Sequence, residues 1–409
     1  MSRPIFTPKK EGPSLTKIVI VLALLAAVAY GGLYGYQYYR SVRRAQTVQK
    51  APDVIQQAQD FIDQGKYDEA KDNLTALLDK PGAATVAPRA LRLLAEIARH
   101  AGDEDQALTY LHRAAYDYPN DAGRPAAAVA YGKQLEKMGR DDDARKVYKD
   151  VTASAPPDLR APALTGLGRL QEKEGHLEAA RDLYKKAVQL APWDSQAWND
   201  ALDALGAANV KLIFSTKPTE DSDYYTVEPG DNLIGIGIKL NTTQGLLTRA
   251  NGLKENSTLH VGQRLKYTHK DFRIVIERST CRLFLFDGSG LFKRYYVGLG
   301  KKGHETTLGK YRIGNKQKNP AWYKPGVGRI PFGDPRNELG TRWMPMVPEA
   351  EDLPRDLGIH GTFQPDSVGK YSSSGCARLI NDKVEELYDL VVRATPVEVV
   401  DKIKPDDAS

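Results

Sequence analysis

The chain has 409 residues, of which 41% are apolar and 27% are charged, and this ordinary globular composition predicts roughly two to four domains. The net charge is +6, but residues 1–50 hold eight basic residues and one acidic residue, so the remainder carries −1 and does not fit a basic nucleic-acid binder. Two cysteines are too few for a disulfide framework.

The N-terminal 39 residues divide into a polar tail and an uncharged segment. Residues 1–16 are polar and contain three prolines, which predicts a short disordered tail. The 22 residues from Ile18 to Tyr39 carry no charge and are long enough to cross about 30 Å of hydrocarbon. We therefore predict a transmembrane helix over residues 17–39. A cleaved signal peptide is the alternative, because Ala27-Val28-Ala29 has the small-x-small form.

A repeat fills residues 53–206. Four glycines recur at intervals of 37, 37 and 36 residues, and each is followed by an alanine five positions later and a large residue four positions after that. This spacing is typical of helix-turn-helix units that bury their apolar faces by stacking. The residues are Gly65, Gly102, Gly139 and Gly175, then Ala70, Ala107, Ala144 and Ala180, then Leu74, Leu111, Tyr148 and Tyr184. The pattern resembles the tetratricopeptide repeat (TPR) and predicts an all-α solenoid, which serves either as a protein-binding surface or as a spacer.

Residues 207–223 combine a short apolar run with a polar one and are predicted as a linker. Residues 224–268 then predict a small βααβ module, with a turn at Gly230 and with Asp231 placed to cap the first helix. This segment resembles a LysM domain, which implies binding of glycans that contain N-acetylglucosamine. Asn232 stands where that family commonly has threonine.

Residues 272–401 predict a mainly β domain of the sandwich or barrel type, with one helix near its end. Short β-branched and aromatic runs alternate with glycine turns, and they cover Arg273–Ile276, Arg282–Phe286, Arg294–Val297, Lys310–Ile313 and Val397–Val400. The expected helix covers Asp382–Arg393.

The sequence from His360 to Leu379 holds the candidate chemistry. A thiol with a pKa of about 8.5 needs a nearby base to react at neutral pH, and His360 is the candidate base for Cys376. Backbone N–H groups near Gly375 and Cys376 are candidate donors to an oxyanion. The alternative for such a pair is a buried structural cysteine beside an unrelated histidine.

The same stretch resembles the signature of the YkuD-type L,D-transpeptidases, in which H-G-T is followed at this distance by S-H-G-C-x-R. The residues in register are His360, Gly361, Thr362, Gly369, Ser373, Gly375, Cys376 and Arg378. Further segments similar to that family are Thr306–Gly309, Asn319–Tyr323 and Asn337–Gly340, the last of which reads N-E-L-G where the family has N-P-L-G. The family histidine before Gly-Cys is Ser374 here, so all base work is expected from His360.

The resemblance also implies a set of substrate-binding residues. Arg378 is expected either to hold a substrate carboxylate or to fix the cysteine loop through a salt bridge. Thr362 and Ser373 are expected to contact substrate, and Ser374 to belong to the oxyanion loop with Gly375. Trp322 and Tyr323 are expected to form a wall of the groove, unless they pack in the core.

Two further residues, His304 and Cys281, are not expected to take part in the chemistry. His304 is expected to be solvated rather than a second base, and Cys281 to pack as a small apolar residue rather than to bridge to Cys376. The seven histidines are scattered without ligand spacing, so neither a metal nor another cofactor is expected.

Together these features predict a multidomain protein of the bacterial cell envelope, anchored in the membrane through residues 17–39 with its domains on the outer side. The resemblance implies a peptidoglycan L,D-transpeptidase that forms cross-links through a cysteine thioester. Its partners would be stem peptides and glycan strands, with a possible protein partner on the repeats and no nucleic acid. A non-catalytic peptidoglycan-binding scaffold and a thiol L,D-carboxypeptidase are the alternatives.

Overall fold

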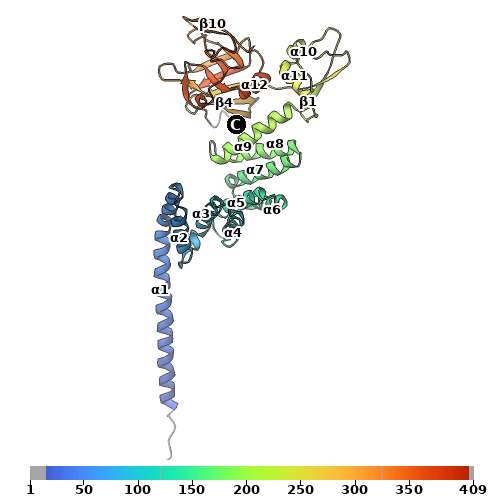
Figure 1. The fold of residues 1–409 in the computed structure, drawn as a ribbon. Coiled ribbons are helices and arrows are strands. Elements are labelled where there is room, and N and C mark those ends of the chain that lie inside the picture. The colour runs from blue at the N-terminus through green and yellow to red at the C-terminus, as the bar shows by residue number, and fades with distance from the viewer. Residues whose placement is uncertain (1–14, 120, 325, 405–409) are drawn as a thin grey trace, which may run out of the picture. The chain divides into compact units, whose positions relative to one another are not determined.

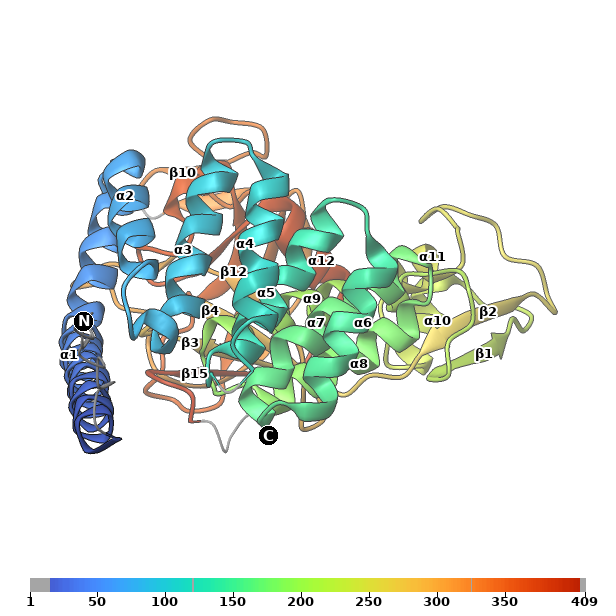
Figure 2. The ribbon, with the colours of Figure 1, turned by 90° about the horizontal axis from the view of Figure 1, so that it is seen from below.

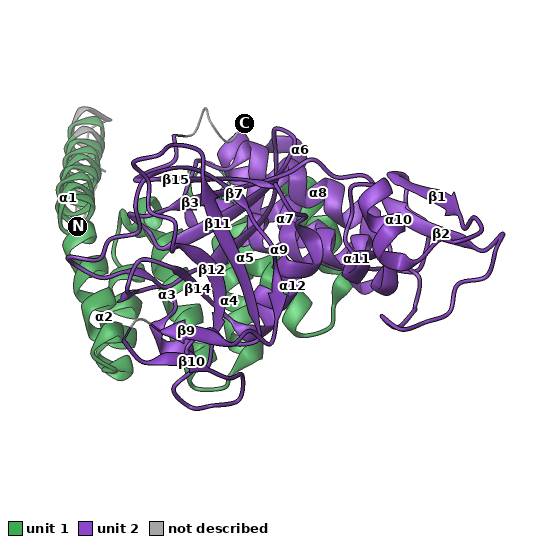
Figure 3. Ribbon diagram, turned by 90° about the horizontal axis from the view of Figure 1, so that it is seen from above, with its two compact units in different colours: residues 1–151 green, residues 152–409 purple. Residues whose placement is uncertain are grey.

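The computed structural model describes residues 15–119, 121–324 and 326–404, and its two compact units, residues 1–151 and 152–409, are coloured separately in Figure 3. The first unit is helical (Figure 1). Its elements are α1 (Leu15–Asp63), α2 (Tyr67–Leu78), the 3-10 helix η1 (Ala83–Thr85), α3 (Ala87–His100), α4 (Glu104–Tyr116), α5 (Arg124–Lys137) and most of α6 (Asp141–Ser154).

Helix α1 has 49 residues and includes the segment predicted to span a membrane. Among the residues that the structure describes, no helix combines the length and the apolar character needed to cross a bilayer. The predicted transmembrane helix over 17–39 is therefore not supported, and the helix that contains it continues to Asp63. The predicted tail, residues 1–16, lies outside the described residues except for its last two, which begin α1.

The predicted helical repeat is present. Each of its four glycines joins two helices with a φ between 74° and 86°, a backbone conformation that glycine adopts without strain. The four repeat alanines are fully buried. A Cβ on Gly132 would lie 2.5 Å from the ring of Tyr148, and one on Gly168 would lie 2.3 Å from the ring of Tyr184, so a bulky residue packs where a glycine lets two helices approach closely.

In the second unit, helices α7 (Pro157–Lys173), α8 (Leu177–Leu190) and α9 (Gln196–Ile213) lead into the β domain. Helix α9 packs on that domain, where Trp198 meets Phe284 and Arg294 donates two 2.8 Å hydrogen bonds to Asp203. Residues 207–213, predicted as part of a linker, are thus the last turns of α9. Four of their apolar side chains are buried rather than solvated: Ala208, Val210, Leu212 and Ile213.

The predicted βααβ module consists of β1 (Ser222–Thr226), α10 (Leu233–Lys239), α11 (Gln244–Ala250) and β2 (Arg264–Thr268), with β1 and β2 antiparallel (Figure 2). The cap of α10 differs from the prediction. Asn232 Oδ1, not Asp231, accepts the N–H of Gly235 at 2.9 Å. Asp231 instead accepts the N–H of Glu228 and the hydroxyl of Tyr225, and so closes the preceding turn.

The β domain is built on one curled sheet with the strand order β14-β12-β11-β7-β15-β3-β4-β5. Gly298, just after β5, exchanges two 2.8 Å backbone hydrogen bonds with Arg378 in β14, so the two edges of the sheet meet. The strands in this order are β3 (Phe272–Glu277), β4 (Arg282–Asp287), β5 (Gly290–Tyr296), β7 (Gly309–Ile313), β11 (Arg342–Pro348), β12 (Gly358–Thr362), β14 (Ala377–Ile380) and β15 (Pro396–Val400), and β8 joins the sheet by pairing with β11.

Shorter elements complete the domain: β6 (Leu299–Gly300) pairs with β13 (Tyr371–Ser373), β9 (Trp322–Lys324) with β10 (Gly328–Ile330), and β8 (Gln317–Lys318) with β11, while η2 covers Pro365–Ser367. Helix α12 (Asn381–Leu390) follows β14 directly, and it ends three residues earlier than predicted.

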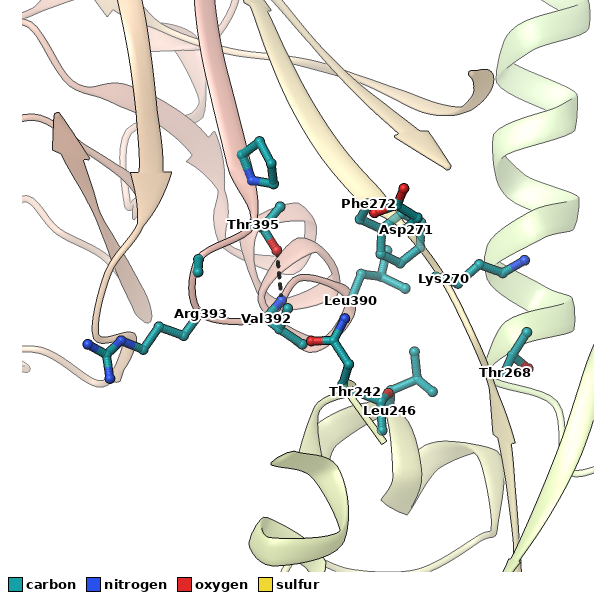
Figure 4. Close-up of a pocket in the computed structure, with 13 residues that line it drawn as sticks. Thr242, Leu246, Thr268, Lys270, Asp271, Phe272, Leu390, Val392, Arg393 and Thr395 are labelled. Carbon is teal, nitrogen blue, oxygen red and sulfur yellow. Dashed lines mark hydrogen bonds between the residues drawn. The ribbon is translucent and has the colours of Figure 1, made fainter. Parts of the chain in front are cut away.

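The βααβ module is attached to the β domain through α11 and α12. Thr243 donates its hydroxyl proton to the carbonyl of Asp389, and Arg249 lies 3.3 Å from the carboxylate of the same residue. Leu246 joins the apolar core of the β domain. A cavity of about 200 Å³ lies beside this junction (Figure 4), where Thr395 Oγ1 accepts the N–H of Val392. Contacts between α11 and α12 therefore join the two domains within the second compact unit.

Candidate active site

Two neighbouring parallel strands position the predicted catalytic residues. His360 in β12 is the register partner of Arg378 in β14, and Cys376 immediately precedes β14. Because side chains alternate along a strand, Ala377 and Leu379 point into the core, where they are fully buried. Cys376, Arg378 and His360 line one cavity of about 590 Å³. The structure thus brings the thiol and the imidazole to the same cleft.

The imidazole of His360 is held in one orientation. Its Nδ1 lies 2.6 Å from the carbonyl oxygen of Gly361, so Nδ1–H donates there and Nε2 carries the lone pair. Only 3% of the residue is exposed. This burial lowers the pKa of His360 to about 4, and the positive charge of Arg378 acts in the same direction. The ring is therefore neutral, and able to accept a proton, at physiological pH.

Burial also acts on the thiol of Cys376, in the opposite direction. It raises the pKa of Cys376 to about 11, and the carboxylate of Asp356 adds to this effect. The Sγ atom lies 3.8 Å from the carbonyl oxygen of Asp356. The resting pair is consequently a neutral thiol and a neutral imidazole rather than a preformed ion pair.

The loop before Cys376 is fixed by Ser373, which is buried. Ser373 Oγ donates to the carbonyl of Cys376 at 2.7 Å and accepts the N–H of Gly375 at 3.1 Å. The N–H of Gly375 thus already has an acceptor within the loop, and its role as an oxyanion donor stays a prediction. Within the described ranges the N–H of Cys376 has none, so it is the available donor.

The backbone conformation and the close packing at Gly375 favour glycine at this position. Its φ is +120°, and a Cβ at this position would lie 2.9 Å from the side chain of Leu357. Ser374, where the family histidine is expected, is exposed and lines the cavity.

Arg378 makes the salt bridge that was one of its two predicted roles. Its Nη2 donates to Glu338 Oε2 at 2.7 Å, while its buried Nε has no acceptor in the described part of the chain. Glu338 also lines the cavity. Glu338 is not among the site residues predicted from the sequence, although its place in the N-E-L-G segment, where the family has proline, was a usable signal.

The strand β9 supplies one side of the cleft. Trp322 and Tyr323 both line it, and Tyr323 is 72% exposed, so it forms part of an open wall and not of the core. Lys324 lies 4.6 Å from the ring of Trp322. Buried Asn337 braces this side, because its Nδ2 donates to the carbonyl of Pro320 at 2.9 Å.

The described residues that line the cavity include neither Thr362 nor His304. Thr362 was predicted to contact substrate, but its hydroxyl accepts the N–H of Gln364 at 3.0 Å and stabilises the turn after β12. His304 is exposed. Cys281 is buried and both cysteines are free, which excludes a bridge between them. Over residues 15–119, 121–324 and 326–404 no cluster of His, Cys, Asp and Glu is arranged to hold a metal ion.

Models of known families match the helical repeats, the βααβ module and the β domain. The model of the L,D-transpeptidase catalytic domain matches residues 271–399, that of the LysM domain matches 225–268, and that of the tetratricopeptide repeat matches 55–122 and 129–195. All three resemblances noted in the sequence are thereby confirmed.

Individual relatives have the same family name. The putative L,D-transpeptidase YkuD of Bacillus licheniformis is 30% identical over 181 residues, which cover 43% of this chain and 97% of that protein. The putative L,D-transpeptidase YqjB of Bacillus subtilis strain 168 is 33% identical over 128 residues, which cover 31% of this chain and 70% of that protein. A solved L,D-transpeptidase from Mycobacterium smegmatis is 18% identical with a TM-score of 0.27, over 34% of this chain and 64% of that one. Because this chain covers 97% of the first relative at 30% identity, it belongs to the YkuD family of L,D-transpeptidases.

Proposed function

We propose that the protein is a peptidoglycan L,D-transpeptidase that works through a thioester at Cys376 and acts in the cell wall, where its LysM module binds glycan. The observation that carries this proposal is that Cys376 and His360 line one cleft, with Nε2 of the imidazole free to accept a proton. By family resemblance, the donor is a stem peptide whose third residue is a diamino acid followed by a terminal D-alanine.

The reaction has two steps. In the first, Sγ of Cys376 attacks the carbonyl of the diamino acid while His360 Nε2 takes the thiol proton, and the N–H of Cys376 donates to the oxyanion. The C–N bond then breaks, and His360 gives the proton to the leaving D-alanine. In the second, an amine of another stem attacks the thioester, His360 takes the amine proton, and the thiolate leaves and is reprotonated. The thioester conserves the energy of the cleaved bond, so no nucleotide is required.

The test is acylation of the full chain by a disaccharide-tetrapeptide or a carbapenem, followed by mass spectrometry. Cys376→Ala should abolish the adduct, whereas Cys281→Ala, which removes the other free thiol, should keep it. Cross-linked dimer in the product would identify a transpeptidase, and free tripeptide alone would identify a carboxypeptidase. An adduct that survives Cys376→Ala, or no adduct with either reagent on the intact chain, would overturn the thioester mechanism.

A further inference from the structure

Glu338 and Arg378 form an ion pair in the wall of the catalytic cleft. The side chain of Arg378 is 11% exposed and that of Glu338 is 41% exposed, so the cation lies deeper and the anion nearer to solvent. The contact joins the segment before β11 to the strand that follows Cys376, and Cys376 lines the same cavity.

Both partners keep unused hydrogen-bonding capacity. A guanidinium has five N–H donors, yet Arg378 makes one side-chain hydrogen bond, to Glu338 Oε2, and its buried Nε has no acceptor. No described residue bonds to the other carboxylate oxygen of Glu338. Nη1 of Arg378 also bonds to no described residue and, unlike Nε, is not buried, so it is the donor that a ligand in the cavity can reach.

The charges of Arg378 and Glu338 nearly cancel, and this cancellation determines which kind of ligand the ion pair favours. A lone arginine attracts any anion, and a lone glutamate attracts any cation. A fixed cation beside a fixed anion attracts neither strongly at a distance, but it matches a group that carries both charges at the same spacing. An α-amino acid end, with a carboxylate and an ammonium on one carbon, is such a group.

We propose that Glu338 and Arg378 form a subsite for a zwitterionic amino-acid end, with the ligand carboxylate on Arg378 and its ammonium on Glu338. The inference rests on the proposed function and specifies its substrate class. The subsite favours stem peptides in which the side chain of the third residue ends in a carboxylate and an ammonium on one carbon. It disfavours stem peptides with lysine at the third position and those in which that carboxylate is amidated.

Binding to full-length Cys376→Ala protein, measured by calorimetry, tests the subsite without any need for turnover. The probes are a tetrapeptide with diaminopimelate at its third position, the same peptide N-acetylated at the side-chain centre, and the same peptide amidated there. Both modifications should weaken binding about tenfold, the usual effect of losing one charge-assisted hydrogen bond. Equal affinity for all three peptides would overturn the proposal, and this comparison needs no variant at Glu338.

The matched variant is Glu338→Gln in the same protein. Glutamine keeps an oxygen that accepts the hydrogen bond of Arg378, so the arginine stays in place while the negative charge is removed. Affinity for the unmodified peptide should fall about tenfold, and affinity for the N-acetylated peptide should change less than about twofold. An equal loss with both peptides would mean that Glu338 acts only by holding Arg378, and no loss with either would exclude it from the site.

The two proposals can fail separately. If the intact chain forms no adduct with a carbapenem but Cys376→Ala still distinguishes the three peptides, the subsite stands and the thioester mechanism falls. If the adduct forms while the three peptides bind alike, the chemistry stands and the subsite falls.

Discussion

His360 lies directly opposite Arg378 on the parallel strands β12 and β14. This pairing places a permanent cation beside the imidazole and, two residues before Arg378, sets the thiol of Cys376 on the same side of the sheet. Burial and the cation together keep the proton off His360, while burial keeps the proton on Cys376. Attack and proton transfer are therefore expected to occur together.

The pH dependence of acylation follows from this arrangement. Because the pKa of His360 is lowered to about 4, the imidazole loses its proton at low pH and stays neutral as the pH rises, so the rate should fall only below about pH 4. Alkylation of Cys376 by iodoacetamide should instead be slow at pH 7 and rise toward pH 11. Rates of carbapenem adduct formation between pH 3 and 9 check the first point. An acid limb near the unperturbed value of about 6.5 would contradict it.

Removal of the proposed base, His360, should slow acylation strongly. His360→Gln should reduce the acylation rate by about 10²-fold or more, the usual contribution of a general base. The residual rate should rise with pH up to about 11, because only the thiolate can then attack. A wild-type rate in this variant would exclude His360 as the base.

Ser374→His restores the family residue at an exposed position of the cleft. The larger side chain replaces an exposed one, and His360 is the proposed base, so acylation should be unchanged or faster. Ser374→Ala is the control, because it removes the hydroxyl without adding a ring. A large loss of rate in Ser374→His alone would show that the cleft depends on a small residue here.

Gly375→Ala should destabilise the protein by about 2–4 kcal/mol and slow acylation. The added Cβ combines left-handed backbone strain with a contact 2.9 Å from Leu357, which is itself buried. Gly369→Ala is the matched control, since its φ of +79° brings the strain but no atom lies within 4 Å of the new Cβ. Its cost should be about 1 kcal/mol. Equal unfolding free energies for the two variants would remove Leu357 from the explanation.

Two helix caps of the LysM module, Asn232 and Thr243, should differ in their effect on the β domain when each is replaced by alanine. Asn232 caps α10 and Thr243 caps α11, so alanine at either position should cost about 1 kcal/mol. Thr243 alone also donates to the carbonyl of Asp389 in α12. Hydrogen exchange in α12 should therefore accelerate in Thr243→Ala and not in Asn232→Ala. Identical exchange in the two variants would show that the domains move independently.

The sequence alone predicted those strands and turns whose residue types have a strong preference for that conformation. The runs that became β3, β4 and β15 are rich in β-branched and aromatic residues, and the repeat glycines mark turns that need a positive φ. The cysteine and the histidine were found because a motif fixed their spacing.

The remaining features depend on contacts that are distant in sequence. Strand β11 contains Pro345 and Pro348, and β12 contains two glycines, so neither has the composition of a strand; both form because neighbouring strands pair with them. The partner of Arg378 lies 40 residues away, at Glu338, and no local pattern reveals that contact. The occupied N–H of Gly375 likewise becomes visible only when Ser373 is placed.

Helix α11 rests on α12, and α12 continues without a break from the strand that follows Cys376. If the LysM module binds glycan as proposed, the contacts of Thr243 and Arg249 with Asp389 would keep that glycan on the side of the β domain that carries α12. Its chemistry would then be confined to stem peptides in the neighbourhood of the sugar that it holds.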